Sequence, residues 1–390
     1  MLCAFARDNR NGRSRLLLLC ILAMASPARA GQSVGDVTPN TAVDTGTLGK
    51  GQGLGIFNDP DFLVVPIPIS NPTIGSGAAL AGAMLFKTDA QSSSSMIGAA
   101  TFRTSNGSWG GGAVASFAFD EDRYRAKLSL GYADILYDFY GVGQAAVEKG
   151  RFISINQGGD LVQASFQTRI APHLYAGLQA RYMNIKTAFN LPDLAGTLLD
   201  NGGPLSKIDD LLNTVGLVAT YDSRNRDYSP NAGQLIDGEI DFGSHNFIQS
   251  NGFTRTTADY NRYDALNDDL VLASHGSLCM ANGSVPIFDL CLFGSSNDLR
   301  GYAVGKYQDK AMFTEQEELR WHAFWRIGFV AFAGIGSVAP SADRFGDILA
   351  SAGVGMRFLA SKDYGINVGI DGAVTKEGDK AFYIQVGEAF

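Results

Sequence analysis

Apolar and polar residues alternate along most of the chain with a period of two. In LYAGLQARYM (174–183) the even-numbered positions are apolar or aromatic, whereas the odd-numbered positions include Gln179 and Arg181. INVGIDGAV (366–374) alternates in the same way, with Ile370 and Asp371 on opposite faces. Runs of about ten alternating residues are typical of strands that cross a membrane in a barrel.

Sixteen such segments follow one another, joined alternately by short and long connections. Short connections include 171–172 and 325–327, and long ones 189–211 and 282–312. A soluble sandwich would also alternate, but the even strand count and the two classes of connection favour an all-β transmembrane antiparallel barrel of about 16 strands. The predicted strands are 60–70, 77–87, 95–104, 110–120, 122–141, 152–170, 173–188, 212–224, 233–245, 252–264, 268–281, 313–325, 327–338, 348–360, 365–375 and 381–390.

The first 30 residues have the composition of an export signal. Several arginines precede the apolar run LLLLCILAMA (16–25), which is short for a membrane span, and ARA (28–30) supplies small residues for cleavage. We therefore predict a signal peptide over 1–30, a short flexible periplasmic tail over 31–58 and the barrel over 59–390. The leader contains five arginines and one aspartate, so its removal changes the formal net charge from −8 to about −12. Such an acidic chain is not expected to bind nucleic acid.

Two of the four cysteines lie in the leader, which leaves Cys279 and Cys291, twelve positions apart. In an exported protein this pair favours a disulfide. Two free thiols remain the alternative, and two ligands alone would make a poor zinc site.

The sequence offers little that indicates catalysis. GQSVG (31–35) fits a nucleophile-elbow pattern but has no strand before it. GKGQGLG (49–55) lacks the ending of a phosphate-binding loop. We predict no catalytic, cofactor-binding or metal-binding residues. Several charged residues at alternating positions are interpreted as a structural charge ladder in the barrel interior: Arg169, Arg181, Arg255, Asp259, Arg320 and Arg357.

The stretch FGSSNDLRGY (293–302) resembles the (V/L)-R-G-(F/Y) motif of the BamA/TamA superfamily of outer-membrane assembly and secretion barrels, also called the bacterial surface antigen family. Two departures stand out: Gly334 occupies a position that is usually acidic in the family, and the chain is similar to the subgroup that lacks periplasmic POTRA domains. Further segments resemble family motifs in the same order: YDSRNRDYSPNAGQ (221–234), EELRW (317–321), VAFAGIGSV (330–338), AGVGMRF (352–358) and GEAF (387–390).

The resemblance implies that the loop containing Arg300 folds back into the barrel, where acidic residues hold the arginine. Glu318 and Asp371 face the lumen by the alternation, so we expect Arg300 to pair with one or both. Gly301 would allow a turn or a close backbone approach, and Tyr302 would pack against the wall. A solvated loop arginine is the alternative.

In the family the closing strand ends on an aromatic residue and meets the first strand at a weakly paired seam. Gly387 and Phe390 are accordingly interpreted as a C-terminal strand signal. The expected protein is a non-enzymatic barrel of the bacterial outer membrane that inserts or translocates proteins or lipids. Its expected partners are outer-membrane lipid and lipopolysaccharide, client proteins and a separate periplasmic partner. A passive plugged pore or structural barrel, and a surface enzyme or adhesin, remain alternatives.

Overall fold

In the computed structural model the described residues are 58–71, 73–148, 150, 152–190, 207–226, 229–245, 252–294, 298–361 and 366–390. The predicted signal peptide and nearly all of the predicted periplasmic tail lie outside these ranges. No helix in the described part of the chain is long and apolar enough to cross a membrane.

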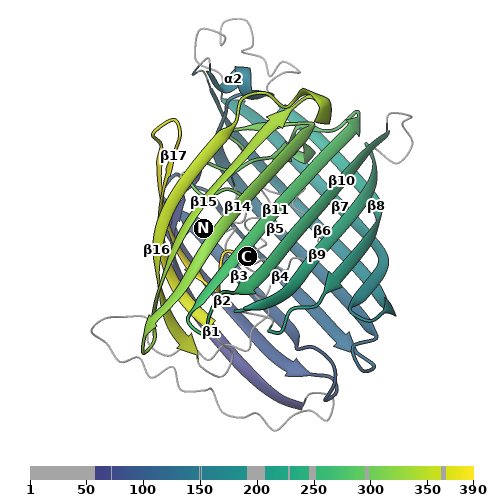
Figure 1. Cartoon of the computed structure of the whole chain (residues 1–390). Coiled ribbons are helices and arrows are strands. Elements are labelled where there is room, and N and C mark those ends of the chain that lie inside the picture. Colours follow the sequence, from purple (N-terminus) through teal and green to yellow (C-terminus); the bar gives the residue numbers. More distant parts are fainter. Residues whose placement is uncertain are drawn as a thin grey trace, which may run out of the picture.

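Sixteen antiparallel strands form one sheet that is rolled into a nearly closed barrel (Figure 1), which confirms the predicted fold class. Strands that are neighbours in sequence are neighbours in the sheet, as in an up-and-down barrel. The strands of the wall are β1 (Asn58–Asn71), β2 (Gly75–Lys87), β3 (Ser95–Thr104), β4 (Trp109–Phe119), β5 (Tyr124–Phe139), β6 (Ile153–Ala171), β7 (Leu174–Asn190), β8 (Lys207–Asp222), β9 (Ala232–His245), β10 (Gly252–Ala265), β11 (Leu270–Gly283), β14 (Ala311–Phe324), β15 (Ile327–Ala339), β16 (Leu349–Ser361), β17 (Ile366–Thr375) and β18 (Lys380–Val386).

The remaining elements are short and lie in connections. A two-stranded sheet, β12 (Cys291–Leu292) with β13 (Gln308–Asp309), and the 3-10 turn η2 (Ile287–Asp289) lie between β11 and β14. The helix α2 (Gln144–Glu148) follows β5, and the 3-10 turn η3 (Ala342–Arg344) follows β15. We call residues 284–294 and 298–310 the inner loop.

The two faces of the strands differ as the alternation predicts. Leu178 and Val354 point outward and are 66% and 67% exposed, whereas Gln179 and Arg181 point inward and are buried. The inward face is itself divided. On β1–β4 its described side chains are mostly apolar or small, such as Ile69 and Phe102, whereas the charged side chains of the lumen lie from β5 onward. The lumen therefore has an apolar wall and a charged wall.

The closing strand is shorter than predicted. We expected it over 381–390, but β18 ends at Val386. Gly387 has a φ of +85°, a conformation that favours glycine, and the chain leaves the wall there. Ala389 and Phe390 are buried, so residues 387–390, which we call the tail segment, turn into the barrel instead of completing its wall.

The first and last strands meet without a ladder. The sheet order ends with β1 and β18, and no strand pairing joins them in the part of the chain that the structure describes. They are nevertheless neighbours. β18 has 7 residues and β1 has 14, so half of β1 could remain unpaired even if all of β18 were matched to it. We call this junction the seam.

Candidate functional site

The inner loop lies in the barrel lumen between the two walls. Its Phe288, Leu292 and Val304 pack in one apolar cluster with Ile69 and Phe102 of β1 and β3. This contact buries apolar area that would otherwise face water in the lumen, which favours the inward position of the loop. The apolar wall thus receives one side of the loop, and the polar side turns toward the charged wall.

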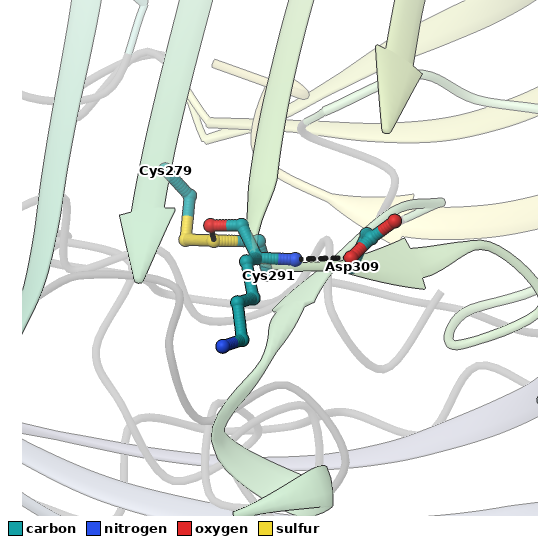
Figure 2. The surroundings of a disulfide bond; sticks show 4 residues. Cys279, Cys291 and Asp309 are labelled. Atoms are coloured by element: carbon teal, nitrogen blue, oxygen red, sulfur yellow. Dashed lines mark hydrogen bonds between the residues drawn. A yellow bond between two sulfur atoms is a disulfide. The ribbon is translucent and has the colours of Figure 1, made fainter. Parts of the chain in front are cut away.

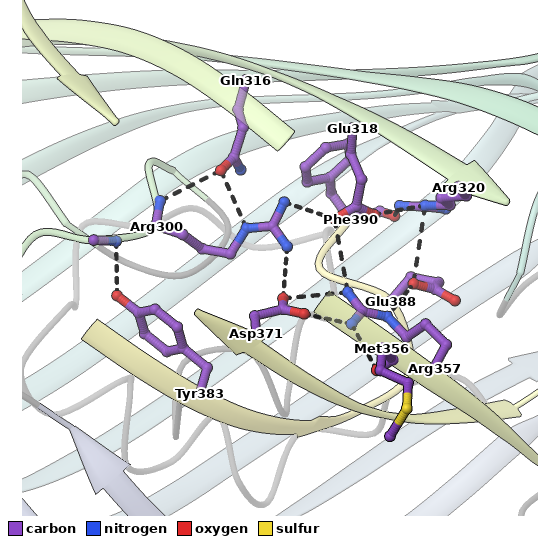
Figure 3. A network of polar contacts seen from close by, with 11 residues as sticks. Arg300, Gln316, Glu318, Arg320, Met356, Arg357, Asp371, Tyr383, Glu388 and Phe390 are labelled. Carbon is purple, nitrogen blue, oxygen red and sulfur yellow. Dashed lines mark hydrogen bonds and ion pairs between the residues drawn. The ribbon is translucent and has the colours of Figure 1, made fainter. Parts of the chain in front are cut away.

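Arg300 is the centre of the polar side. Its Nη2 lies 2.6 Å from Oε2 of Glu318 on β14, and its Nη1 lies 2.7 Å from Oδ2 of Asp371 on β17. Its Nε donates to Oε1 of Gln316 at 3.1 Å, and its guanidinium lies 3.4 Å from the centroid of the Phe332 ring. Figure 3 shows the arginine between the strands that carry these partners. The structure thus brings Arg300 together with both expected carboxylates, and all three side chains are fully buried.

The two carboxylates are shared with two further arginines. Nε of Arg320 lies 2.7 Å from Glu318, and Nη1 of Arg357 binds Asp371. Both arginines also approach Glu388 of the tail segment: Nε of Arg357 lies 3.0 Å from its Oε2, and Nε of Arg320 lies 3.9 Å from it. The side chains of three cations and three carboxylates therefore alternate, and the formal charges of these six side chains add up to zero. We call this group the ion cluster: Arg300, Arg320, Arg357, Glu318, Asp371 and Glu388 (Figure 3).

Charge balance explains why so many ions can be buried together. An isolated buried charge is costly, whereas a paired and hydrogen-bonded one is tolerated. The charge ladder that we predicted for Arg320 and Arg357 is therefore part of the loop's binding site. Sequence reasoning missed Glu388, because it was assigned to a strand of the wall.

Gly301 and Tyr302 hold the loop against the same wall. Gly301 has a φ of +117°, and a Cβ there would lie 3.0 Å from Cγ2 of Thr375. Its N–H donates to the Tyr383 hydroxyl on β18 at 2.8 Å. The Tyr302 hydroxyl donates to Glu377 at 2.7 Å. Burial and this carboxylate raise the pKa of the Tyr302 hydroxyl above its ordinary value.

A second buried ion pair anchors the inner loop near its beginning. Both oxygens of Asp289, in the η2 turn, accept hydrogen bonds at 2.8 Å from the two terminal nitrogens of Arg181 on β7. Both side chains are fully buried. Arg255 of β10 is also buried, and among the described residues its guanidinium nitrogens have no hydrogen-bond partner. Asp289 is the strongest attractive charge acting on it. Sequence reasoning missed Asp289; the only signal was one acid in the otherwise apolar segment PIFDL (286–290).

A disulfide ties the start of the inner loop to the wall. Cys279 of β11 and Cys291 of β12 are bonded, with their Cα atoms 5.7 Å apart (Figure 2). Both residues are buried. The structure thus forms the predicted pair and does not show two free thiols. Together with Asp289 and Arg300, the bond holds the loop at three places.

The family departure at Gly334 has a steric explanation. A Cβ at this position of β15 would lie 2.5 Å from Cδ1 of Leu299 and 2.5 Å from the carbonyl oxygen of Glu315. Leu299, which precedes Arg300, is fully buried. The missing side chain therefore makes the space in which Leu299 of the inner loop packs.

We expect Gly334→Ala to lower the free energy of unfolding by about 2 kcal/mol, because the added carbon must displace Leu299 or the β14 backbone. The measurement is thermal unfolding followed by the change in gel mobility between the folded and unfolded barrel. Gly238→Ala on β9 is the matched control, since a Cβ there meets no atom within 4 Å. Equal effects of the two substitutions would contradict the steric explanation.

The arrangement is mechanical in character: it fixes a loop in the lumen by ion pairs, apolar contact and a disulfide. Within the described ranges, no three His, Cys, Asp or Glu side chains are grouped so that they could hold a metal ion. Of the residues predicted for the C-terminal strand signal, Gly387 forms the turn and Phe390 stacks on His275 of β11, with ring centroids 5.1 Å apart.

Comparison with known proteins supports the resemblance found in the sequence. A family model described as the Omp85 superfamily domain matches residues 114–390. A search of curated proteins finds no match. Among solved structures, BamA from Haemophilus ducreyi lacking POTRA domains 1–3 is similar with a TM-score of 0.53 and 16% identity, over 83% of this chain and 68% of that one.

Two structures of CdiB are also similar. The protein from Escherichia coli has a TM-score of 0.54 and 11% identity, over 83% of this chain and 61% of that one. The protein from Acinetobacter baumannii has a TM-score of 0.52 and 12% identity, over 84% of this chain and 58% of that one. The chain thus spans less than two thirds of either CdiB structure. At these identities the likeness concerns the fold alone.

Proposed function

Because the chain belongs to the Omp85 superfamily and is a β-barrel of the bacterial outer membrane, we propose that it is a non-enzymatic barrel that handles polypeptide clients at its seam. The observation that carries the proposal is the missing ladder between β1 and β18. Unpaired strand edges are costly in hydrocarbon and readily accept another strand. A client strand could therefore pair with β1 at a site where the barrel wall does not pair with itself.

Two prolines on β1 support the proposal, because their ring nitrogens face the seam and not β2. The pairing of β1 with β2 runs without interruption from Asp61 to Asn71. Because proline has no N–H, Pro66 and Pro68 must occupy the positions that do not bond to β2, and their ring nitrogens point to the seam. The seam edge of β1 thus lacks two donors in alternate positions. This edge cannot form a regular ladder with β18, or with any other strand, at those positions, so a client strand would pair with the rest of β1.

The position of the inner loop inside the lumen also favours the seam over an axial route. The inner loop is fixed at Cys291, Asp289 and Arg300 to strands of the charged wall, and its apolar side packs on β1 and β3. The same fixation is the one observation in favour of a second candidate function, a plugged structural barrel without clients. Outer-membrane lipid and lipopolysaccharide would surround the outward apolar face in either case, and a separate periplasmic partner would deliver clients in the first.

The test is site-specific photocrosslinking from the seam in living cells, with probes at Ile384 of β18 and Leu63 of β1. Crosslinks to other outer-membrane or secreted proteins are expected. Crosslinks only within the barrel or to lipid would overturn the proposal and leave the plugged barrel. The same probe chemistry at Leu178, which faces lipid on β7, is the control for random collisions in the membrane.

We expect the double substitution Pro66→Val and Pro68→Val to reduce client crosslinks from Ile384 by about tenfold. The two restored donors are available to any strand, at roughly 0.5–1.5 kcal/mol per hydrogen bond, but β18 already lies beside β1 and would take them first. The yield of crosslinked client relative to the total barrel is the measurement. Val64→Ile, another outward position of β1, changes no donor and should have no effect. Unchanged crosslinking in the proline variant would show that the prolines do not control the seam.

A further inference from the structure

The tail segment joins the seam strand to the charged wall. Oε1 of Glu388 accepts a hydrogen bond from Asn367 at 2.5 Å, and Oε2 accepts one from Arg357 at 3.0 Å. Nη2 of Arg320 donates to the backbone oxygen of Phe390 at 2.5 Å. The Phe390 ring lies in a buried cluster with Tyr263 and Ala273. The last residues after β18 are therefore held by β17 and by strands on its far side.

The inner loop contacts the same seam strand directly. The Gly301 N–H binds the Tyr383 hydroxyl of β18. One residue earlier, Arg300 shares Asp371 with Arg357 and shares Glu318 with Arg320. Arg320 and Arg357 thus contact both the carboxylates that bind Arg300 and the carboxylate of Glu388. They connect the inner loop to the tail segment, although 88 positions separate Arg300 from Glu388.

A charge count shows what loss of the loop contact does to the tail. With Arg300 in place, three cations face three carboxylates. Without it, Arg320 and Arg357 must serve Glu318, Asp371 and Glu388. Glu318 and Asp371 are fixed within strands, whereas Glu388 follows the turn at Gly387 and can leave. The excess carboxylate that is expelled is therefore Glu388, because an unpaired buried carboxylate is strongly disfavoured.

We infer that the ion cluster couples the inner loop to the seam: when Arg300 leaves the cluster, Glu388 is released and the tail segment frees the end of β18. The coupling is reciprocal, because thermodynamic linkage requires that loss of Glu388 weaken the hold on Arg300 by the same factor. The biological role of this coupling rests on the proposed function, because release of the β18 end would change the strand edge that clients meet. The coupling itself is measurable without a client.

The test uses the purified full-length chain in lipid nanodiscs. Ala389, which is fully buried, is replaced by cysteine, and its rate of maleimide labelling reports release of the tail segment. We expect Arg300→Gln to accelerate labelling at least about fivefold, the lower end of typical coupling between sites. Arg300→Lys keeps three cations in the ion cluster, so its labelling rate should stay within about twofold of the rate of the chain that retains Arg300. Arg262→Gln, in an exposed pair with Asp264, is the matched control.

A second experiment tests the coupling in the reverse direction. It leaves the loop sequence intact, so it remains informative even if Arg300→Gln fails to fold. Glu388→Gln should accelerate hydrogen exchange of the Arg300 and Gly301 amides at least about fivefold, because these amides bind Gln316 and Tyr383 only while the loop is seated. Unchanged labelling in Arg300→Gln, or unchanged exchange in Glu388→Gln, would overturn the coupling. Absence of client crosslinks in cells would instead overturn the proposed function and leave the coupling standing.

Discussion

Replacing Arg300 by alanine should lower the free energy of unfolding of the barrel by about 3 kcal/mol. The substitution leaves Glu318 and Asp371 fully buried with one cation fewer, and breaking a buried ion pair from one side costs roughly 3–5 kcal/mol. We expect the lower end of that range, because Arg320 and Arg357 remain beside the two carboxylates. The loss of contact with the Phe332 ring adds to the effect.

Thermal unfolding of the folded barrel, read from gel mobility, measures this loss. Arg262→Ala provides the matched control, because Arg262 also pairs with an aspartate at 2.7 Å but its side chain is 52% exposed. Exposed pairs contribute about 0–1 kcal/mol. Similar transition temperatures for the two variants would mean that the buried position of Arg300 does not contribute to stability.

Replacing Asp289 by alanine should cost about 4 kcal/mol, and replacing its partner Arg181 should cost about 3 kcal/mol. The order of the two effects follows from Arg255. In Asp289→Ala both Arg181 and Arg255 remain buried without their principal negative charge. In Arg181→Ala the carboxylate still has Arg255 nearby, and Arg255 has unused donors.

The comparison needs both variants and a control in the same unfolding assay. Asp343→Ala removes an exposed aspartate from the other 3-10 turn, η3, and should change stability by less than about 0.5 kcal/mol. A larger loss in Arg181→Ala than in Asp289→Ala would show that Arg255 does not respond to Asp289. In that case the second anchor would be a simple pair.

Strand positions and side-chain faces were accessible from the sequence because a strand alternates strictly. Once LYAGLQARYM and INVGIDGAV are read as strands, the inward direction of Arg181 and Asp371 follows from position alone. The predicted strand 95–104 coincides with β3, and most other boundaries differ by one or two residues. Contacts of Arg300 with Glu318 and Asp371 were accessible only through the resemblance, since the three residues lie on different elements.

Other parts of the site have no periodic signal. Asp289 lies in an irregular loop, and its partner Arg181 is 108 positions away on β7. GEAF continues the alternation of β18 well enough to read as strand, yet the turn at Gly387 sends it inward. The departure from the family at Gly334 was visible in the sequence. Its reason was not, because it is the side chain of Leu299 in the inner loop that packs against Gly334. Loop contacts of this kind depend on where the chain returns in space.

The buried disulfide implies an order of events during biogenesis. Cys291 is fully enclosed once the inner loop lies in the lumen, and Cys279 is 1% exposed. A protein oxidant of the periplasm must touch a thiol to form the bond, and it could not reach either sulfur through the finished wall. We therefore expect the bond to form before the sheet rolls up. Cys279 and Cys291 are only twelve positions apart, so oxidation of the exported, still open chain would already hold the loop beside β11, and the barrel would then close around a plug that is in place.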